Sequence, residues 1–265
     1  MRYELVPMQS LVSAMAELPM GASVSVTCSP RKGIDATLAA SEQLLAAGHG
    51  VVPHISARLF EGHEQVGRLA RWIRSAGLDE IFVVGGDVPA PLGPYPDAAA
   101  LLRELLSHDT GLRAIGFAAY PDGHGFIGRD DLHAALHTKQ ELLADAAIDG
   151  WATTQMCFDT GRMAEWLRTQ RDGGLVLPIH VGIPGSVDRT QLMKMGLRLG
   201  VGSSLSYLRK NRAVVGRLLG TRRYDPTPLV LDIGAWATSL GVTGLHSFTF
   251  NQVETTRHWQ ERFAT

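Results

Sequence analysis

Short β-rich runs alternate with longer helical stretches along the whole chain, and this alternation limits the possible folds more than any other feature. We expect strands over eight segments: residues 23–28, 50–56, 80–86, 113–120, 152–158, 176–183, 200–204 and 244–251. The stretches between them carry apolar residues at helical spacing. Eight strands separated by helices predict a closed (β/α)₈ barrel, the TIM barrel, because an open doubly wound sheet usually has fewer strands.

Glycines mark the ends of several predicted helical stretches. Gly48, Gly77 and Gly241 stand where a left-handed residue ends a helix before the next strand. The strand at 200–204 is the least certain of the eight, since residues 191–200 have helical spacing and leave it only four or five residues. No repeat or long linker divides the chain, so we expect one barrel domain over residues 1–265.

Composition favours a small-molecule-binding protein of the cytoplasm. The chain is 45% hydrophobic and 19% charged with a net charge of -1, so neither nucleic acid nor an acidic membrane surface is an expected partner. No apolar run is long enough to span a bilayer, and the N-terminus does not resemble a signal peptide. Cys28 and Cys157 lack the spacing of a metal site or a disulfide framework, so we expect free thiols.

Polar residues at the strand ends are the candidates for the functional site, because active sites of these barrels lie at the carboxyl ends of the strands. The candidates are Thr27, His54, Asp87, Tyr120, His124, Gln155 and the segment from His246 to Asn251. Each has a structural alternative. Asp87 fits an N-cap or turn residue equally well, and His54 and His124 fit ordinary loop or core histidines.

Gln155 is the hardest of these residues to explain structurally. It stands within the segment Ala152–Phe158, which otherwise has the composition of a buried strand. An unsatisfied amide inside a barrel costs about 1–3 kcal/mol, so a ligand or a neighbouring strand must supply a partner.

The residues that follow the strand at 80–86 suggest a site for a flat ligand. Two glycines, Gly85 and Gly86, allow close approach to the backbone, and the loop at 87–97 holds four prolines in eleven residues. This stiff loop could wall a ligand with Tyr95, although a purely structural loop fits as well. With no paired carboxylates, nucleophile elbow or metal-ligand cluster, the remaining polar pocket suits an aromatic heterocycle such as a flavin or a pterin.

Six motifs in order along the chain resemble the methylenetetrahydrofolate reductases: PHIS (53–56), GGDVP (85–89), AAYPDGH (118–124), TTQMCFD (153–159), VGIPG (181–185) and HSFTFNQ (246–252). The resemblance implies a flavin-dependent (β/α)₈ barrel of one-carbon metabolism and methionine biosynthesis. It further implies FAD as cofactor, NADH or NADPH as hydride donor, and a tetrahydrofolate derivative as substrate. The oligomeric state stays open, a homo-oligomer included.

The resemblance also implies roles for individual residues. Asp87 corresponds to a carboxylate that contacts folate and tunes the flavin, and Gln155 to an amide that bonds the pterin and the nicotinamide donor in turn. Phe248 and Gln252 fall at substrate-binding positions. The flavin-binding positions are His54, Gly86, Tyr95, Ala119, Tyr120, His124 and Lys139, the last with an offset of about three residues in its spacing to Gln155.

The most important departure from the family concerns its general acid. The first strand of the family ends in a Glu followed by aromatic and proline residues, and that Glu helps to open the methylene bridge. With residues 23–28 as the first strand, Thr27 takes this position, and no Asp or Glu lies between Met20 and Asp35. A threonine hydroxyl does not ionise in the useful range, so water or Thr27 would have to relay the proton.

Two arginines of the family are also absent. Gly85 stands where an Arg usually precedes Gly-Asp, and Gln252 where an Arg follows the Asn of the last strand. Both losses remove charged contacts, on the flavin side and the folate side respectively. Arg31, Lys32 and Arg257 are the candidates to compensate from other loops.

Three functional hypotheses follow. The first is a divergent methylenetetrahydrofolate reductase. The second keeps the barrel and the folate but drops the flavin or the reductase chemistry, as the missing acid and arginines suggest. The third is an interaction protein on a barrel scaffold, which the polar strand ends disfavour.

Overall fold

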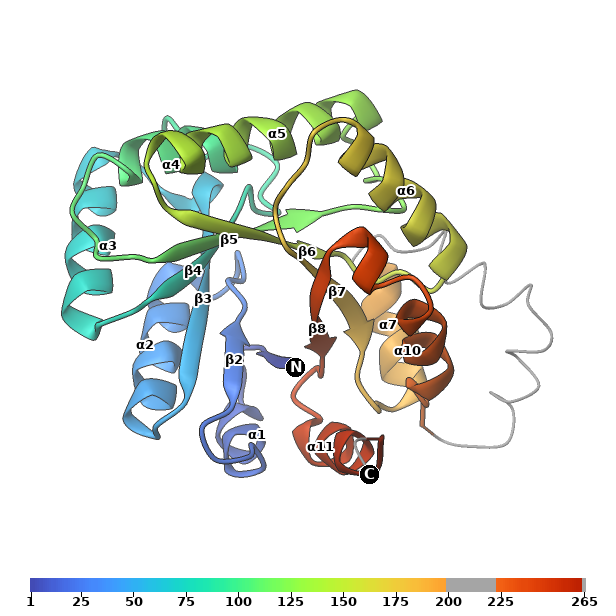
Figure 1. The fold of residues 1–265 in the computed structure, drawn as a ribbon. Helices are drawn as coiled ribbons and strands as arrows, with labels where there is room; N and C mark the ends of the chain where they lie inside the picture. The colour runs from blue at the N-terminus through green and yellow to red at the C-terminus, as the bar shows by residue number, and fades with distance from the viewer. Residues whose placement is uncertain (199–222, 264–265) are drawn as a thin grey trace.

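Eight parallel strands form a closed barrel in the computed structural model, which describes residues 1–198 and 223–263 (Figure 1). Neighbouring strands pair in sequence order, and β8 returns to β1. The predicted TIM barrel is therefore confirmed. The strands are β1 (Arg2–Leu5), β2 (Ser23–Val26), β3 (Gly50–Ser56), β4 (Glu80–Val84), β5 (Ala114–Ala119), β6 (Asp149–Thr154), β7 (Ile179–Pro184) and β8 (Val242–Phe248).

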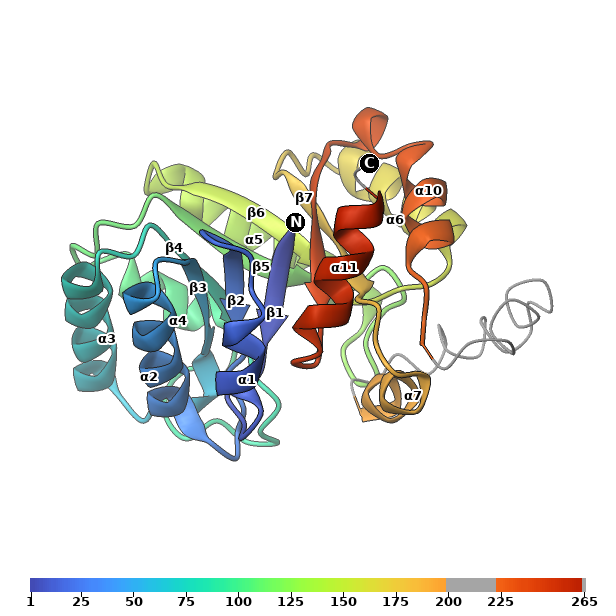
Figure 2. The same ribbon diagram turned by 90° about the horizontal axis from the view of Figure 1, so that it is seen from below.

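Helices form a layer outside the strands, and α11 lies beside α1 near the two chain ends (Figures 1 and 2). Gly48, Gly77 and Gly241 have positive φ angles of 82°, 63° and 71°, as expected for residues that end helical segments. The helices are α1 (Leu11–Ala16), α2 (Gly33–Ala46), α3 (His63–Ala76), α4 (Ala98–Leu105), α5 (Arg129–Asp145), α6 (Thr160–Asp172), α7 (Arg189–Arg198), α10 (Thr227–Gly234) and α11 (Val253–Phe263), with short 3₁₀ turns at Ala57–Leu59 and Thr238–Leu240.

The predicted strand count was right, but the strand order was wrong at the start of the chain. The first strand is β1, at Arg2–Leu5, so the predicted strand at 23–28 is the second. The segment 200–204 lies outside the described residues, and the barrel closes without it because β7 pairs directly with β8.

β1 was missed because its polar residues face the barrel interior and its apolar residues face the helices. Tyr3 and Leu5 are 2% and 0% exposed, and the Tyr3 hydroxyl donates to Gln260 of α11. Arg2 and Glu4 lie on the opposite face, because side chains alternate along a strand. The short segment therefore does not have the apolar run expected of a buried barrel strand.

The barrel interior is unusually polar for this fold, in which branched aliphatic side chains normally fill the layers. Two glycines make room for large rings: a Cβ on Gly116 would lie 2.4 Å from the Trp151 ring, and one on Gly244 would lie 2.9 Å from His180. The polar or ring-bearing side chains of the interior include Arg2, Glu4, Ser25, His54, Phe82, Trp151, Thr153, His180 and His246.

Candidate functional site

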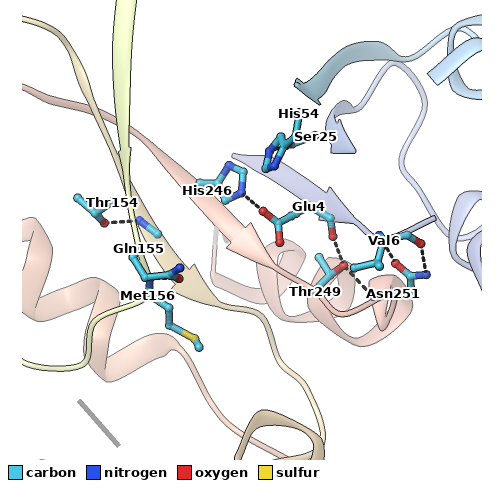
Figure 3. A network of polar contacts seen from close by, with 11 residues as sticks. Glu4, Val6, Ser25, His54, Thr154, Gln155, Met156, His246, Thr249 and Asn251 are labelled. Carbon is cyan, nitrogen blue, oxygen red and sulfur yellow. Dashed lines mark hydrogen bonds and ion pairs between the residues drawn. The ribbon is translucent and has the colours of Figure 1, made fainter. Parts of the chain in front are cut away.

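A buried carboxyl group lies at the carboxyl end of β1. The Oε2 atom of Glu4 is 3.0 Å from His246 Nε2 of β8, and both side chains are buried (Figure 3). Among the described residues no hydrogen bond reaches the other carboxyl oxygen, Oε1. Glu4 is the strand partner of Phe248, whose ring lies 5.2 Å from the His246 ring. Glu4 thus presents one carboxyl oxygen at the level where strands β1 and β8 end.

A second histidine, His54 of β3, lies beside His246 inside the barrel. His54 Nε2 lies 2.5 Å from Ser25 Oγ, and the His54 ring stacks on His246 with 6.5 Å between centroids. Burial lowers the pKa of His54 to about 4, opposed by the negative charge of Glu4. His54 is therefore neutral near pH 7. It lies inside the barrel, not at the open mouth where the resemblance implied a flavin contact.

The loop after β4 brings bare backbone to the mouth. Gly86 has a φ of 101°, and a Cβ there would lie 3.0 Å from Ser56 Oγ. Only glycine adopts this conformation without strain. The side chain of Ser56 thus lies close to the backbone at Gly86, whereas Gly85 has free space around it.

Asp87 interacts electrostatically with two residues of the loop after β5, Tyr120 and His124. Burial raises the pKa of Tyr120 to about 12, and the charge of Asp87 raises it further. Burial lowers the pKa of His124, and Asp87 opposes that shift. The Tyr120 and His124 rings meet edge to face at 5.1 Å. Two atoms in this loop, Asp122 Oδ2 and His124 Nδ1, are buried without a hydrogen-bond partner in the described part of the chain.

Gln155 lies directly after β6, across the barrel from Glu4 (Figure 3). Its backbone N–H donates to Ala119 O at 2.7 Å, and its side-chain Oε1 accepts from Met156 N at 2.8 Å. The carbonyl half of the amide is thus satisfied locally. The NH₂ group has no partner among the described residues and remains available to a ligand.

The proline-rich loop is shaped by an arginine that the sequence did not single out. Arg58 donates to Pro96 O at 2.7 Å and to Val88 O at 3.1 Å, which fixes both ends of the loop. Tyr95 packs edge to face on Phe60 and its hydroxyl donates to Glu104. The loop is pre-shaped as expected, but Tyr95 is not brought together with the strand-end residues.

Two further predicted residues have their polar groups occupied or enclosed within the protein. Lys139 is buried on α5 with its Nζ 5.0 Å from the centroid of the Phe117 ring, and burial lowers its pKa to about 8. The amide of Gln252 is engaged, accepting from Asp188 N at 2.9 Å and donating to Gln191 Oε1 at 2.6 Å.

Thr27 was assigned to the acid position because residues 23–28 were taken as the first strand. Thr27 follows β2, and its N–H donates to Leu5 O of β1 at 2.9 Å. The strand that is actually first carries Glu4 within the sequence Glu-Leu-Val-Pro. This segment shares the Glu and the proline of the family's pattern but has Leu and Val in place of aromatic residues, so the sequence offered only a partial match. Arg257, a candidate to compensate for the missing arginines, instead pairs with Glu17 and Glu261.

Within residues 1–198 and 223–263, no three His, Cys, Asp or Glu side chains are grouped so that they could hold a metal ion. None of the helices in this same part of the chain is both long enough and apolar enough to cross a bilayer.

Comparison with known proteins supports the fold alone. No protein-family model matches the chain. A Clostridium thermocellum protein that binds two copies of 5-methyl-5,6,7,8-tetrahydrofolic acid is similar in structure, with a TM-score of 0.63 at 12% identity over 100% of this chain and 95% of that one. Two Burkholderia cenocepacia proteins are more distant: a candidate phosphonomutase (TM-score 0.49, 11% identity, 98% and 91% covered) and a candidate lyase or mutase (0.47, 15%, 99% and 78%).

Proposed function

We propose that this protein binds a tetrahydrofolate derivative at the carboxyl end of the barrel. We further propose that it reduces 5,10-methylenetetrahydrofolate to 5-methyltetrahydrofolate with NADH or NADPH and a bound flavin, FAD. The motifs that resemble the methylenetetrahydrofolate reductases lead to this proposal. The folate ligand of the structurally similar Clostridium thermocellum protein supports its folate part.

Glu4 is the observation that carries the reductase proposal. Opening the methylene bridge requires a proton on the departing nitrogen, and a carboxyl group held at the site can donate it. Glu4 is buried on the first strand, is hydrogen-bonded through Oε2 and keeps Oε1 unengaged among the described residues. Glu4 would thus supply the acidic proton that the Thr27 hydroxyl cannot supply.

The mouth residues fit a flavin. A flat ring with nitrogen and oxygen atoms on its edges needs bare backbone and unsatisfied polar groups, which this site offers. Gly86 carries no side chain, the Gln155 NH₂ group has no partner in the described structure, and the buried atoms Asp122 Oδ2 and His124 Nδ1 have none either. We expect Gly86, Tyr120, His124 and Gln155 to hold the ring.

A bound flavin would carry hydride from the nicotinamide to the folate. The chain's own residues would do the rest. The Gln155 NH₂ group would donate to the pterin or the nicotinamide, and Phe248 would pack against the pterin ring beside Glu4. Asp87, exposed after β4, would place a negative charge near the flavin and the folate.

A folate-binding protein without reductase activity is the second candidate. Gly85 and Gln252 replace two arginines of the family, and Arg257 is already paired with Glu17 and Glu261. Arg31 and Lys32, in the loop after β2, are the remaining candidates to bind the acidic part of folate.

An absorption spectrum of the purified protein, followed by titration with 5-methyltetrahydrofolate, tests the proposal. Flavin absorbance that is bleached by NADH or NADPH and restored by methylenetetrahydrofolate supports the reductase. Folate binding by a colourless protein that takes up no added FAD supports the second candidate. A protein that binds neither ligand contradicts both.

A further inference from the structure

Four buried polar atoms inside the barrel have no hydrogen-bond partner among the described residues. They are Trp151 Nε1, Thr153 Oγ1, His180 Nδ1 and His246 Nδ1. Polar atoms buried in folded proteins nearly always have a partner, often an ordered water where no protein group reaches them. Four such atoms on three consecutive strands therefore point to something that they bind in common.

The strand register places the four side chains on the inner face of three neighbouring strands. Thr153 of β6 is the direct partner of His180 of β7, and His180 is the partner of Gly244 of β8. His246 follows Gly244 by two residues and so lies on the same face. The Trp151 and His180 rings are 6.1 Å apart.

The chemistry of these atoms matches that of a water molecule. An indole N–H only donates, whereas a hydroxyl and the nitrogens of neutral imidazoles either donate or accept. A buried water makes about three hydrogen bonds, with two to four as the usual range, and this set offers four partners. His246 is special among them, because its other nitrogen, Nε2, already contacts Glu4.

We infer that Glu4 is resupplied with its proton from inside the barrel, through His246 and an internal water held by Trp151, Thr153 and His180. This inference rests on the proposed role of Glu4 as proton donor. After Glu4 protonates the substrate, His246 passes the Nε2 proton to Glu4 Oε2 and takes one from the water at Nδ1. The water takes a proton from His180 Nδ1, and solvent supplies the single proton consumed to His180 Nε2. Rotation of the two rings and of the Glu4 carboxyl group restores the starting state before the next turnover.

His180 is only partly buried, which gives this path access to solvent. Arg2 is the strand partner of His246, and its guanidinium lies 4.9 Å from the centroid of the Trp151 ring. Arg2 also pairs with Glu80, whose side chain is 35% exposed. The charged or titratable groups facing His246 are thus Glu4, Arg2, His54 and His180.

The protonation state of His180 supports a relay. Burial lowers the pKa of His180 to about 4, and the positive charge of Arg2 lowers it further. His180 is therefore neutral near pH 7. A neutral imidazole can release a proton from one nitrogen while it accepts one on the other.

Nuclear magnetic resonance of the ligand-free protein tests the water directly. With ¹⁵N-labelled tryptophan and histidine, we expect magnetisation transfer from a long-lived water to the Trp151 indole N–H and its loss in the near-isosteric Thr153→Val variant. Ser247→Ala is the matched control. Ser247 Oγ is also buried without a partner, but it follows His246 and faces away, toward Gly185. An indole N–H without a water contact overturns the inference.

Kinetics test the relay. In His180→Phe and Thr153→Val we expect folate reduction to slow by roughly tenfold, with a larger solvent deuterium effect, while NAD(P)H-dependent quinone reduction stays within about twofold. Neither residue is bonded to Glu4, so slowing in His246→Gln alone would mean that His246 only positions Glu4, which overturns the relay. If Glu4→Gln leaves folate reduction intact, the proposed function of Glu4 fails, and the resonance experiment still decides whether the water is present.

Discussion

His246 and Glu4 face each other across the seam at which β8 pairs with β1, with 3.0 Å between Nε2 and Oε2. The contact joins residues 242 positions apart and exists only because the barrel closes. Thr249 adds a hydrogen bond from its hydroxyl to Glu4 O at 2.5 Å. The proposed acid is thus fixed from the last strand, by residues that no local pattern around Glu4 reveals.

Replacing Glu4 by Gln should abolish folate reduction and leave the flavin reactions intact. The amide keeps the shape and one acceptor but cannot donate an acidic proton, so we expect at least a 100-fold loss, roughly the scale of general acid catalysis. Steady-state rates with methylenetetrahydrofolate and with a quinone acceptor measure both halves. Thr27→Val is the matched comparison and should change folate reduction by less than about threefold. If Thr27→Val lost more folate reduction than Glu4→Gln, Thr27 would again be the candidate for the proton relay.

Gly86→Ala should destabilise the protein and weaken flavin binding. Alanine at this position would have to adopt a φ of 101°, and its methyl group would lie 3.0 Å from Ser56 Oγ. The resulting strain is about 1–3 kcal/mol. Urea unfolding and flavin titration measure the two effects. Gly85→Ala is the control, because Gly85 has no atom within 4 Å of an added Cβ. Equal behaviour of the two variants would argue against a special backbone at Gly86.

Stability should fall as the pH drops from about 6.5 to 4, because the ordinary histidine pKa lies at the upper limit of this range. Burial lowers the pKa of His54 and of His180 to about 4, so the unfolded chain binds more protons than the native one within this window. The stability due to each neutral histidine is complete above the unfolded pKa and is lost as the pH falls through the folded one. Each contributes about 3 kcal/mol by this linkage.

His54→Gln should remove part of this pH dependence. The amide can keep a hydrogen bond to Ser25 but does not titrate, so the slope of unfolding free energy between pH 6.5 and 4 should be shallower. Urea melts at intervals of half a pH unit measure the slope. At pH 7.5 the histidine is neutral in both states, so data there isolate the packing effect of the substitution. An unchanged slope would contradict the buried, neutral state of His54.

The barrel could be predicted from the sequence, and its first strand could not. Seven of the predicted strands overlap β2 to β8, whereas Arg2–Leu5 was not predicted and the eighth predicted segment, 200–204, lies outside the described residues. β1 has four residues, and its inward side chains are Arg2 and Glu4. A rule that expects apolar side chains inside a barrel rejects such a segment. The partners of Arg2 and Glu4, which are Glu80 and His246, lie far away in the sequence and so give no local signal.

The same reasoning explains which of the predicted site residues lie at the mouth of the barrel. Gly86, Asp87, Tyr120 and Gln155 follow strands directly, so topology alone places them at the mouth. Tyr95 and Lys139 lie in a loop and within a helix, where sequence spacing does not define direction. Their contacts with Glu104 and Phe117 depend on packing between separate elements.

Arg58→Ala should loosen the loop at 87–97 without unfolding the barrel. It removes the hydrogen bonds to Pro96 O and Val88 O. We expect faster hydrogen exchange at residues 88–95 and a flavin affinity lower by about threefold to tenfold, since two hydrogen bonds contribute about 1 kcal/mol each. Arg68→Ala is the control, because it breaks only an exposed pair with Glu64 on α3. Unchanged exchange in the loop would show that the prolines alone hold its shape.

Lys139→Met should separate a structural role of this lysine from a role in cofactor binding. Burial lowers the pKa of Lys139 to about 8, so below pH 8 the native state carries a penalty of about 3 kcal/mol that is relieved as the pH rises toward the unfolded value.

Methionine keeps the apolar stem against Phe117 and removes the charge, so the free energy of unfolding at pH 7 should rise by up to about 3 kcal/mol. If Lys139 also binds the flavin phosphates, as the family resemblance implies, the same variant should lose flavin affinity by at least about tenfold. Urea melts and flavin titration give the two answers independently. A variant that is more stable and binds flavin normally would remove Lys139 from the site, whereas a variant that is less stable would contradict the buried-charge argument itself.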